Sequence, residues 1–85
     1  MNIPTIYWKQ IKDFIETCEG YECTFILSNG DQHTISYVEE FILIYDENEE
    51  VSAVEYYGQD NTGTWQQLII DAESIVEIVE KVRDY

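Results

Sequence analysis

The sequence predicts an α+β domain with a helix at each end and a bent, five-stranded antiparallel sheet between them. Three observations support this class: helical spacing of apolar residues near both ends, alternating apolar and polar residues in the middle, and short polar connections that favour pairing of consecutive strands. With 85 residues, the chain has the length of one domain, residues 1–85, and its 45% apolar content is enough to fill a core.

The N-terminal helix is expected over residues 4–19. Pro4 suits the first turn, where its missing N–H has no partner to lose, and Gly20 is a typical residue just past the end of a helix. The buried face is marked by apolar residues at helical spacing, Ile11, Phe14, Ile15 and Cys18, preceded by Tyr7 and Trp8.

A β-hairpin is expected next. Residues 21–28 alternate between apolar and mixed side chains, and residues 32–38 form the returning strand. The Asn29-Gly30 pair between them predicts a two-residue turn, because both residues tolerate a positive φ.

Three further strands complete the predicted sheet. The acidic pair Glu39 and Glu40 is expected to interrupt the chain before the third strand. Polar segments separate the remaining strands, which are expected over residues 41–45, 51–57 and 64–70, with a turn at 46–50 and a loop at 58–63.

The last element is expected to be a helix. Ile75, Ile78, Val79 and Val82 fit one helical stripe, and Ser74 followed by Glu77 has the pattern of a capping box. A strand is the alternative, with Glu80 as an interruption. In that case the order of elements, with a short turn at residues 71–74 before the final strand, resembles a small SH3-like or Sm-like barrel.

Charge is the dominant feature of the composition. The net charge is −14, and residues 13–80 contain no Lys or Arg but all except one of the 18 acidic residues. Such a surface repels phosphate backbones and anionic membranes and attracts basic protein surfaces. The first 12 residues lack a signal-peptide pattern, and no stretch approaches the length of a membrane span, so a cytoplasmic location is expected.

No motif for catalysis, a metal or a cofactor is recognisable, and we expect a protein that is not an enzyme. Cys18, Cys23 and His33 do not have the spacing of a zinc site, and both cysteines are expected as free thiols in the core. The acidic turn starts like an EF-hand loop at Asp46, but Val51 and Tyr57 occupy the positions of its glycine and final glutamate.

The candidate partner-binding residues are therefore acidic and aromatic. On the predicted last helix, Glu73, Glu77, Glu80 and Asp84 would form a row with a spacing of about 5–6 Å, which is similar to that of successive phosphates. Tyr56 and Tyr57 are adjacent in a strand and so point to opposite faces. Either of them could be exposed, and the burial of Trp65 is equally open. The full set of candidates is Glu39, Glu40, Asp46, Glu47, Glu49, Glu50, Glu73, Glu77, Glu80, Tyr56 and Tyr57.

In size, acidity and lack of catalytic residues, the chain is similar to the DNA mimics encoded by phages and mobile elements. That group contains anti-CRISPR, anti-restriction and uracil-DNA-glycosylase inhibitor proteins, and no family motif accompanies the likeness. The resemblance implies an inhibitor that blocks the nucleic-acid-binding groove of a host defence or DNA-processing enzyme. The alternative is an interaction module that is not a mimic, such as an immunity protein against a basic toxin or a subunit of a larger assembly. The sequence does not indicate an oligomeric state.

Overall fold

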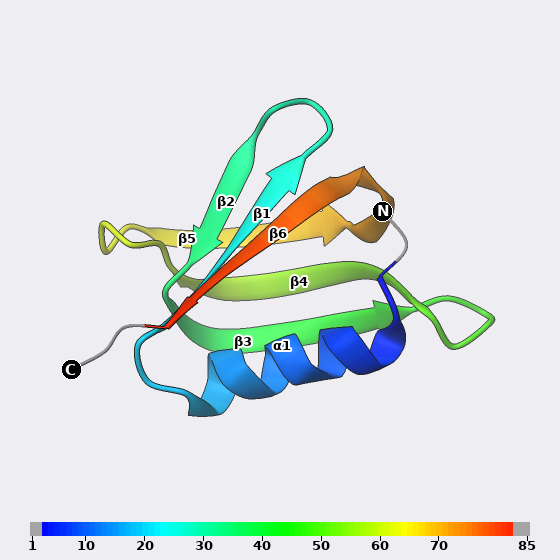
Figure 1. Cartoon of the computed structure of the whole chain (residues 1–85), viewed down its shortest axis with the longest axis horizontal. Coiled ribbons are helices and arrows are strands. Elements are labelled where there is room, and N and C mark those ends of the chain that lie inside the picture. Colours follow the sequence, from blue (N-terminus) through cyan, green and yellow to red (C-terminus); the bar gives the residue numbers. More distant parts are fainter. Residues whose placement is uncertain (1–2, 83–85) are drawn as a thin grey trace.

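The computed structural model describes residues 3–82 and contains one helix and six strands in two antiparallel sheets (Figure 1). The α+β class is confirmed. The elements are α1 (Thr5–Thr17), β1 (Tyr21–Leu27), β2 (Gln32–Ile35), β3 (Tyr37–Tyr45), β4 (Val51–Gln59), β5 (Trp65–Asp71), a 3₁₀ turn η1 (Ala72–Ser74) and β6 (Ile75–Val82).

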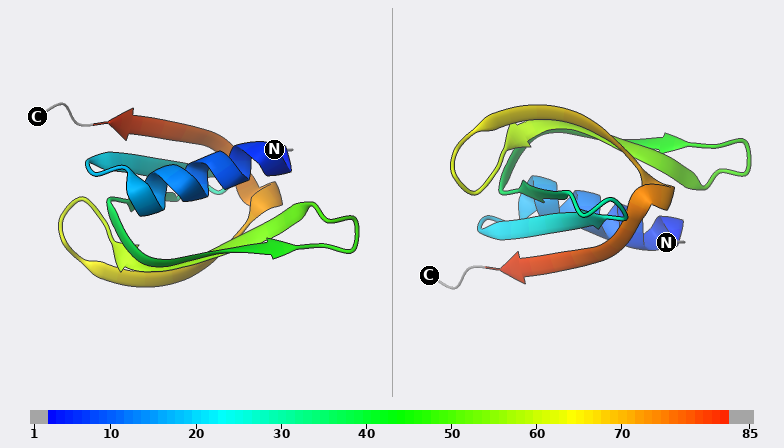
Figure 2. Two further views of the ribbon diagram at one scale, coloured as in Figure 1. Left: turned by 90° about the horizontal axis from the view of Figure 1, so that it is seen from below. Right: turned by 90° about the horizontal axis from the view of Figure 1, so that it is seen from above.

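The single five-stranded sheet of the prediction is wrong, because the strands form two sheets of three. Sheet A has the order β2–β1–β6 and sheet B has the order β3–β4–β5. Figure 2 shows the two sheets as separate layers, with α1 along one side of the space between them. The helix contacts both layers, through β1 and through β3.

The sheet is divided where β2 passes into β3. Ser36 separates these two strands, and its N–H donates to the carbonyl oxygen of Gln59 at 2.9 Å. Close to this point a β-bulge shifts the register between Val38 and Glu40. The expected interruption at Glu39 and Glu40 is therefore wrong: both residues lie within β3, and Glu39 is the extra residue of the bulge.

The C-terminal helix of the prediction is also wrong, and the strand alternative describes this segment. β6 pairs with β1 along its length, with Leu27 opposite Ile75 and Tyr21 opposite Val82. The β-branched Ile and Val residues suit this pleated pairing as well as they fit a helical stripe. Asp84, which the sequence placed on the same helix, lies outside the described residues.

The expected capping box is replaced by a cap on η1. The side chain of Asp71 accepts a hydrogen bond from the N–H of Glu73 at 3.1 Å, and the Ser74 hydroxyl donates to the carbonyl of Asp71 at 2.7 Å. The turn thus satisfies its own polar groups within four residues, which lets the chain pass directly from β5 into β6.

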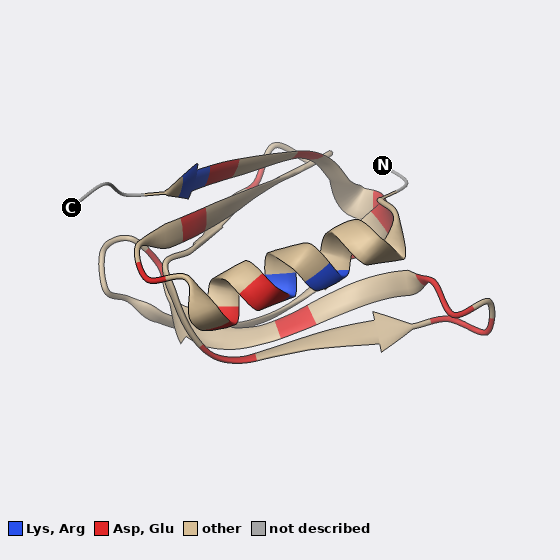
Figure 3. Ribbon diagram, turned by 60° about the horizontal axis from the view of Figure 1, so that its bottom comes forward, with Lys and Arg blue, Asp and Glu red and all other residues tan. Residues whose placement is uncertain are grey.

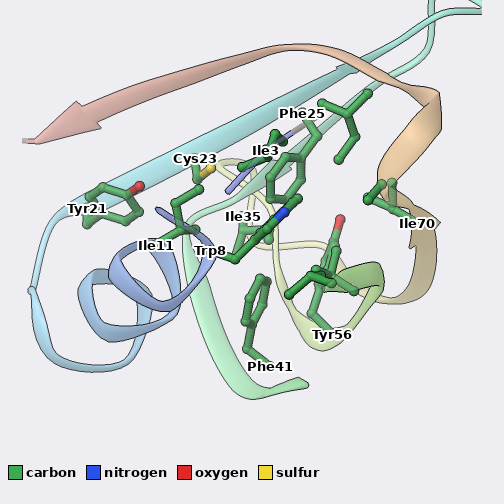
Figure 4. Close-up of a cluster of buried hydrophobic side chains, with 14 residues drawn as sticks. Ile3, Trp8, Ile11, Tyr21, Cys23, Phe25, Ile35, Phe41, Tyr56 and Ile70 are labelled. Carbon is green, nitrogen blue, oxygen red and sulfur yellow. The ribbon is translucent and has the colours of Figure 1, made fainter. Parts of the chain in front are cut away.

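The core lies between the two sheets and is closed by α1 (Figure 4). Trp8 packs against Phe25 with their ring centroids 5.8 Å apart, and Phe41 stacks on Tyr56 at 6.4 Å. Phe14, which was expected on the buried helical face, is 44% exposed because it lies near the end of α1. Cys23 is buried, Cys18 is half-buried, and both thiols are free.

The three hairpins close with the same five-residue turn. At the first turn, the N–H of Leu27 donates to the Asp31 carbonyl at 2.8 Å, and the N–H of Gly30 donates to the Leu27 carbonyl at 2.9 Å. Among the loop residues only Gly30 has a positive φ, so the loop is longer than the expected two-residue turn. It has a three-residue loop that ends in a left-handed glycine.

No helix within residues 3–82 has both the length and the apolar character needed to cross a membrane.

Candidate protein-binding surfaces

Two surfaces bring some of the sequence-predicted residues together, and they lie at opposite ends of sheet B. At the first, pairing of Ala53 with Asp71 places the start of β4 beside the end of β5. The β3–β4 hairpin therefore meets η1 there. We call this surface the acidic end and define it by Asp46, Glu47, Glu49, Glu50, Asp71 and Glu73, all of which are exposed.

A hollow of about 490 Å³ opens at the acidic end. Four carboxylate side chains line it, and none of the lining residues is Lys or Arg. Ile3, Val51 and Ala72 add apolar surface, so the hollow combines negative charge with a partly apolar wall. This combination suits the charged head and apolar stem of a Lys or Arg side chain.

The hairpin at the acidic end has the five-residue turn, with one difference. The side chain of Asp46 accepts hydrogen bonds from the N–H groups of Asn48 at 2.8 Å and Glu50 at 3.1 Å, which holds the turn. Glu49 occupies the left-handed position, with φ +60°, where the other two turns have glycine. The other carboxylates of the hairpin, on Glu47, Glu49 and Glu50, are exposed.

The row of carboxylates predicted on the last helix does not exist. Glu73 lies in η1, whereas Glu77 and Glu80 are three residues apart in β6 and therefore lie on opposite faces of sheet A. Figure 3 shows the acidic residues distributed over several elements rather than along one line. The correction follows from the change of the last element from helix to strand.

Glu80 has a structural role. It accepts a hydrogen bond from the Tyr7 hydroxyl at 2.7 Å and from the Tyr21 hydroxyl at 2.5 Å, which ties β6 to α1 and β1. The hydrogen bond to Glu80 raises the pKa of Tyr7 to about 12. Burial, followed by the hydrogen bond to Glu80, raises the pKa of Tyr21. Both effects stabilise the neutral form of the two tyrosine hydroxyls.

The second surface is the outward face of sheet B at the end opposite the acidic hairpin. We call it the aromatic face and define it by Tyr37, Tyr57 and Trp65, with Glu40 and Glu55 beside them. The register places Tyr37 and Trp65 on either side of Gln59, and Tyr57 is two residues away on the same face of β4. The face is continued along the sheet by Ile42 and Ile69, which are 40% and 66% exposed.

The three rings hold one another in place. Tyr57 stacks on Trp65 with centroids 5.0 Å apart and an interplanar angle of 25°, and Tyr37 meets Trp65 edge to face at 6.1 Å. All three side chains remain exposed: Tyr37 is 55% exposed, Tyr57 is 39% exposed and Trp65 is 45% exposed. Trp65 was left open by the sequence, and Tyr37 was not a candidate. Tyr56 points inward and is only 1% exposed, so it cannot contact a partner directly.

The described lysines belong to α1 and β6, and the two on α1, Lys9 and Lys12, lie beside β3 of sheet B. Figure 3 shows the described Lys residues on α1 and at the end of β6. Lys12 forms an ion pair with Glu16 at 3.0 Å and also donates to the carbonyl of Phe41. Because β3, β4 and β5 contain no Lys or Arg, the acidic end and the aromatic face both belong to a sheet without internal counter-charges.

Within residues 3–82, no group of three or more His, Cys, Asp and Glu side chains is arranged to hold a metal ion. Comparisons with protein-family models, with curated proteins and with solved structures find no match for this chain. The two surfaces of sheet B are therefore the candidate binding sites of this protein.

Proposed function

We propose that this protein is a small acidic binding protein that acts by occupying a basic surface of another protein. The observation that carries the proposal is the acidic end, where the β3–β4 hairpin, the end of β5 and η1 gather six exposed carboxylates. Four of these line a hollow that no Lys or Arg lines. Opposite charge speeds the encounter of such a surface with a basic partner. The function is binding, without catalysis.

The proposal has two forms. In the first form, the basic surface is the nucleic-acid-binding groove of a host defence or DNA-processing enzyme. The protein then competes with DNA or RNA, as an anti-CRISPR, anti-restriction or glycosylase-inhibitor protein would. The net charge of −14 and the acidic end support this form. It no longer rests on a regular carboxylate row, since Glu77 and Glu80 lie on different faces.

In its second form, the partner surface is not a nucleic-acid groove. The protein is then an immunity protein against a basic toxin, or a subunit of an assembly. The aromatic face favours this form, because exposed Tyr and Trp side chains are common anchors of protein interfaces. The two forms share a basic partner and differ in the surface that contributes most of the affinity.

The arrangement of the elements also supports a binding role. β2 continues into β3 across Ser36, and β5 continues into β6 across η1, after a leading helix. We infer from this order a small barrel of the SH3-like or Sm-like kind, in which two sheets share bent strands. Such a scaffold presents hairpins and an outward sheet face rather than a deep catalytic cleft.

Capture of partners from a host lysate, followed by displacement with nucleic acid, tests the proposal and separates its forms. Release of the captured partner by DNA or guide RNA supports groove occupancy. Retention in the presence of nucleic acid, with release on Tyr57→Ala or Trp65→Ala, supports the second form. A partner surface that is not basic would contradict both forms.

A further inference from the structure

We propose that the aromatic face is a docking site for arginine side chains of the basic partner, with one guanidinium stacked on the Tyr57–Trp65 pair and paired with Glu40 or Glu55. This inference rests on the proposed function and adds to it the surface and the side-chain chemistry. It separates the aromatic face, which selects arginine, from the acidic end, which attracts any cation.

The carboxylates beside the rings supply the first argument. Glu40 is the direct cross-strand partner of Tyr57, and Glu55 precedes Tyr57 by two residues on the same face of β4. Directly opposed side chains in a sheet are about 5 Å apart. Together with Ile42 and Gln67, these two glutamates line a shallow recess around Tyr57.

The geometry of the rings supplies the second argument. The stacked Tyr57–Trp65 pair and the edge-on Tyr37 are already in contact, so the rings lose little freedom when a ligand binds. A guanidinium is planar, stacks on aromatic faces and can donate two parallel hydrogen bonds to a carboxylate. A lysine ammonium provides neither the planar stacking nor the paired hydrogen bonds, so arginine is the better fit for this face.

The charge of the face excludes the other occupants. A stacking platform for single-stranded nucleic acid combines aromatic rings with a basic groove. Here Glu40 and Glu55 line the recess around Tyr57, and the lysines beside sheet B lie on α1 rather than among the rings. A second copy of this chain would bring Glu40 and Glu55 close to the same glutamates of its partner, with a net charge of −14 on each copy. A basic protein segment has the complementary charge.

The test is a titration with two synthetic peptides, one of three alternating Gly-Arg pairs and its Gly-Lys counterpart, followed by amide and indole NMR signals. Trp8 is buried and Trp65 is exposed, so the two indole signals report on the core and on the aromatic face. The Gly-Arg peptide should shift the Trp65 indole and the Tyr57 amide, leave the Trp8 indole in place, and bind about threefold or more tightly than the Gly-Lys peptide.

Two variants make the assignment specific. Trp65→Leu should abolish the preference for arginine. Tyr57→Leu removes the other ring of the stacked pair and should abolish the same preference if Trp65→Leu fails to give a folded spectrum. Glu47→Gln is the matched control at the acidic end, where it should weaken both peptides by the same factor and keep the preference.

Each contrary result is distinct. Equal affinity for the two peptides, with shifts centred on residues 46–50, overturns the arginine site and leaves the proposed function standing. Failure of both peptides to bind at low salt contradicts the proposed function as well. Shifts of the Trp65 signal caused by an oligothymidine, or by protein concentration alone, assign the face to nucleic acid or to a second copy and overturn the inference.

Discussion

The two ends of sheet B use the same turn to present different chemistry. At the acidic end, the Asp46 side chain caps the hairpin, and Glu49 takes the left-handed position. At the aromatic end, the Asp60 side chain accepts from the N–H groups of Thr62 at 2.8 Å and Thr64 at 3.1 Å, and Gly63 takes that position.

The two turns differ in the residue at the left-handed position, and this difference affects stability. Hydrogen bonds from the Thr62 hydroxyl and N–H hold the pKa of Asp60 below its usual value, so this carboxylate is engaged in the turn. A glycine at Gly63 adopts its backbone conformation without strain, whereas a side chain at Glu49 does not. The acidic end thus keeps an additional carboxylate at a position where glycine would be more stable.

The largest expected effect is a loss of stability caused by a substitution at the aromatic end of sheet B. A Cβ added to Gly58 would lie 2.2 Å from the carbonyl oxygen of Tyr37 and 2.9 Å from the Cα of Val38, both of them backbone atoms. Gly58→Ala should therefore lower the free energy of unfolding by about 2–3 kcal/mol, measured by urea denaturation. Gly63→Ala is the control, because its Cβ meets no atom and only the φ of +85° is unfavourable, at about 1 kcal/mol. Equal losses for the two variants would contradict the close approach of β3 and β4.

The next effect separates Glu80, which accepts hydrogen bonds from two other elements, from the carboxylates of the acidic end. Glu80→Gln should lower the free energy of unfolding by about 1.5 kcal/mol, because it weakens the hydrogen bonds that Tyr7 and Tyr21 donate to a charged acceptor. Glu47→Gln at the acidic end should change stability by less than about 0.5 kcal/mol. Thermal unfolding of the two isosteric variants side by side checks this ranking, and a reversed order would show that Glu80 is not the link between β6, α1 and β1.

A stabilising substitution tests the comparison of the two turns directly. Glu49→Gly should raise the free energy of unfolding by about 1 kcal/mol, because glycine removes the strain of the left-handed conformation. Glu47→Gly, in the same turn but without a positive φ, should give no such gain. Chemical denaturation measures both, and a loss of stability in Glu49→Gly would contradict the strain at this position.

The smallest effect at neutral pH is expected for Tyr7→Phe, which removes the hydroxyl that donates to Glu80. This substitution should lower the free energy of unfolding by about 0.5 kcal/mol. The pKa of Tyr7 in the folded protein is raised to about 12, above the usual value near 10. A raised folded pKa gives a contribution that is complete below pH 10 and is lost as the pH rises towards 12. Burial likewise raises the pKa of Cys23 from 9 to about 12, so its contribution declines above pH 9.

Urea denaturation from neutral to alkaline pH checks the prediction for Tyr7. The natural protein should lose stability above pH 9, and Tyr7→Phe should lose less of it above pH 10. Identical pH profiles for the two proteins would contradict the link between Tyr7 and Glu80.

The local parts of the fold were predictable from the sequence, and the parts that depend on distant pairing were not. The N-terminal helix and the β1–β2 hairpin follow from helical spacing and from the Asn29-Gly30 signal within a few residues. The apolar residues of the last element fit both a helical stripe and a strand. The pairing of this element with β1, whose residues lie 48 to 61 positions earlier in the chain, decides for the strand. A capping motif such as Ser74–Glu77 contains no information about that partner.

The same distinction applies to the two surfaces. The acidic hairpin is visible as a run of charges, but its proximity to Asp71 and Glu73 depends on the pairing of Ala53 with Asp71. Alternation showed that Tyr56 and Tyr57 point in opposite directions. The pairing of β4 with its neighbours then decides which of the two lies outside. Tyr37 joins Trp65 only through the intervening strand β4, so sequence reasoning had no signal for this contact.

The most direct test of a basic partner is the salt dependence of its affinity for the natural protein and for a variant with Glu47→Gln, Glu49→Gln and Glu50→Gln. We expect the dissociation constant of the captured partner to rise about tenfold or more between about 50 and 300 mM salt, and the variant to bind more weakly with a flatter salt dependence. Affinities that depend neither on salt nor on these three carboxylates would contradict the account.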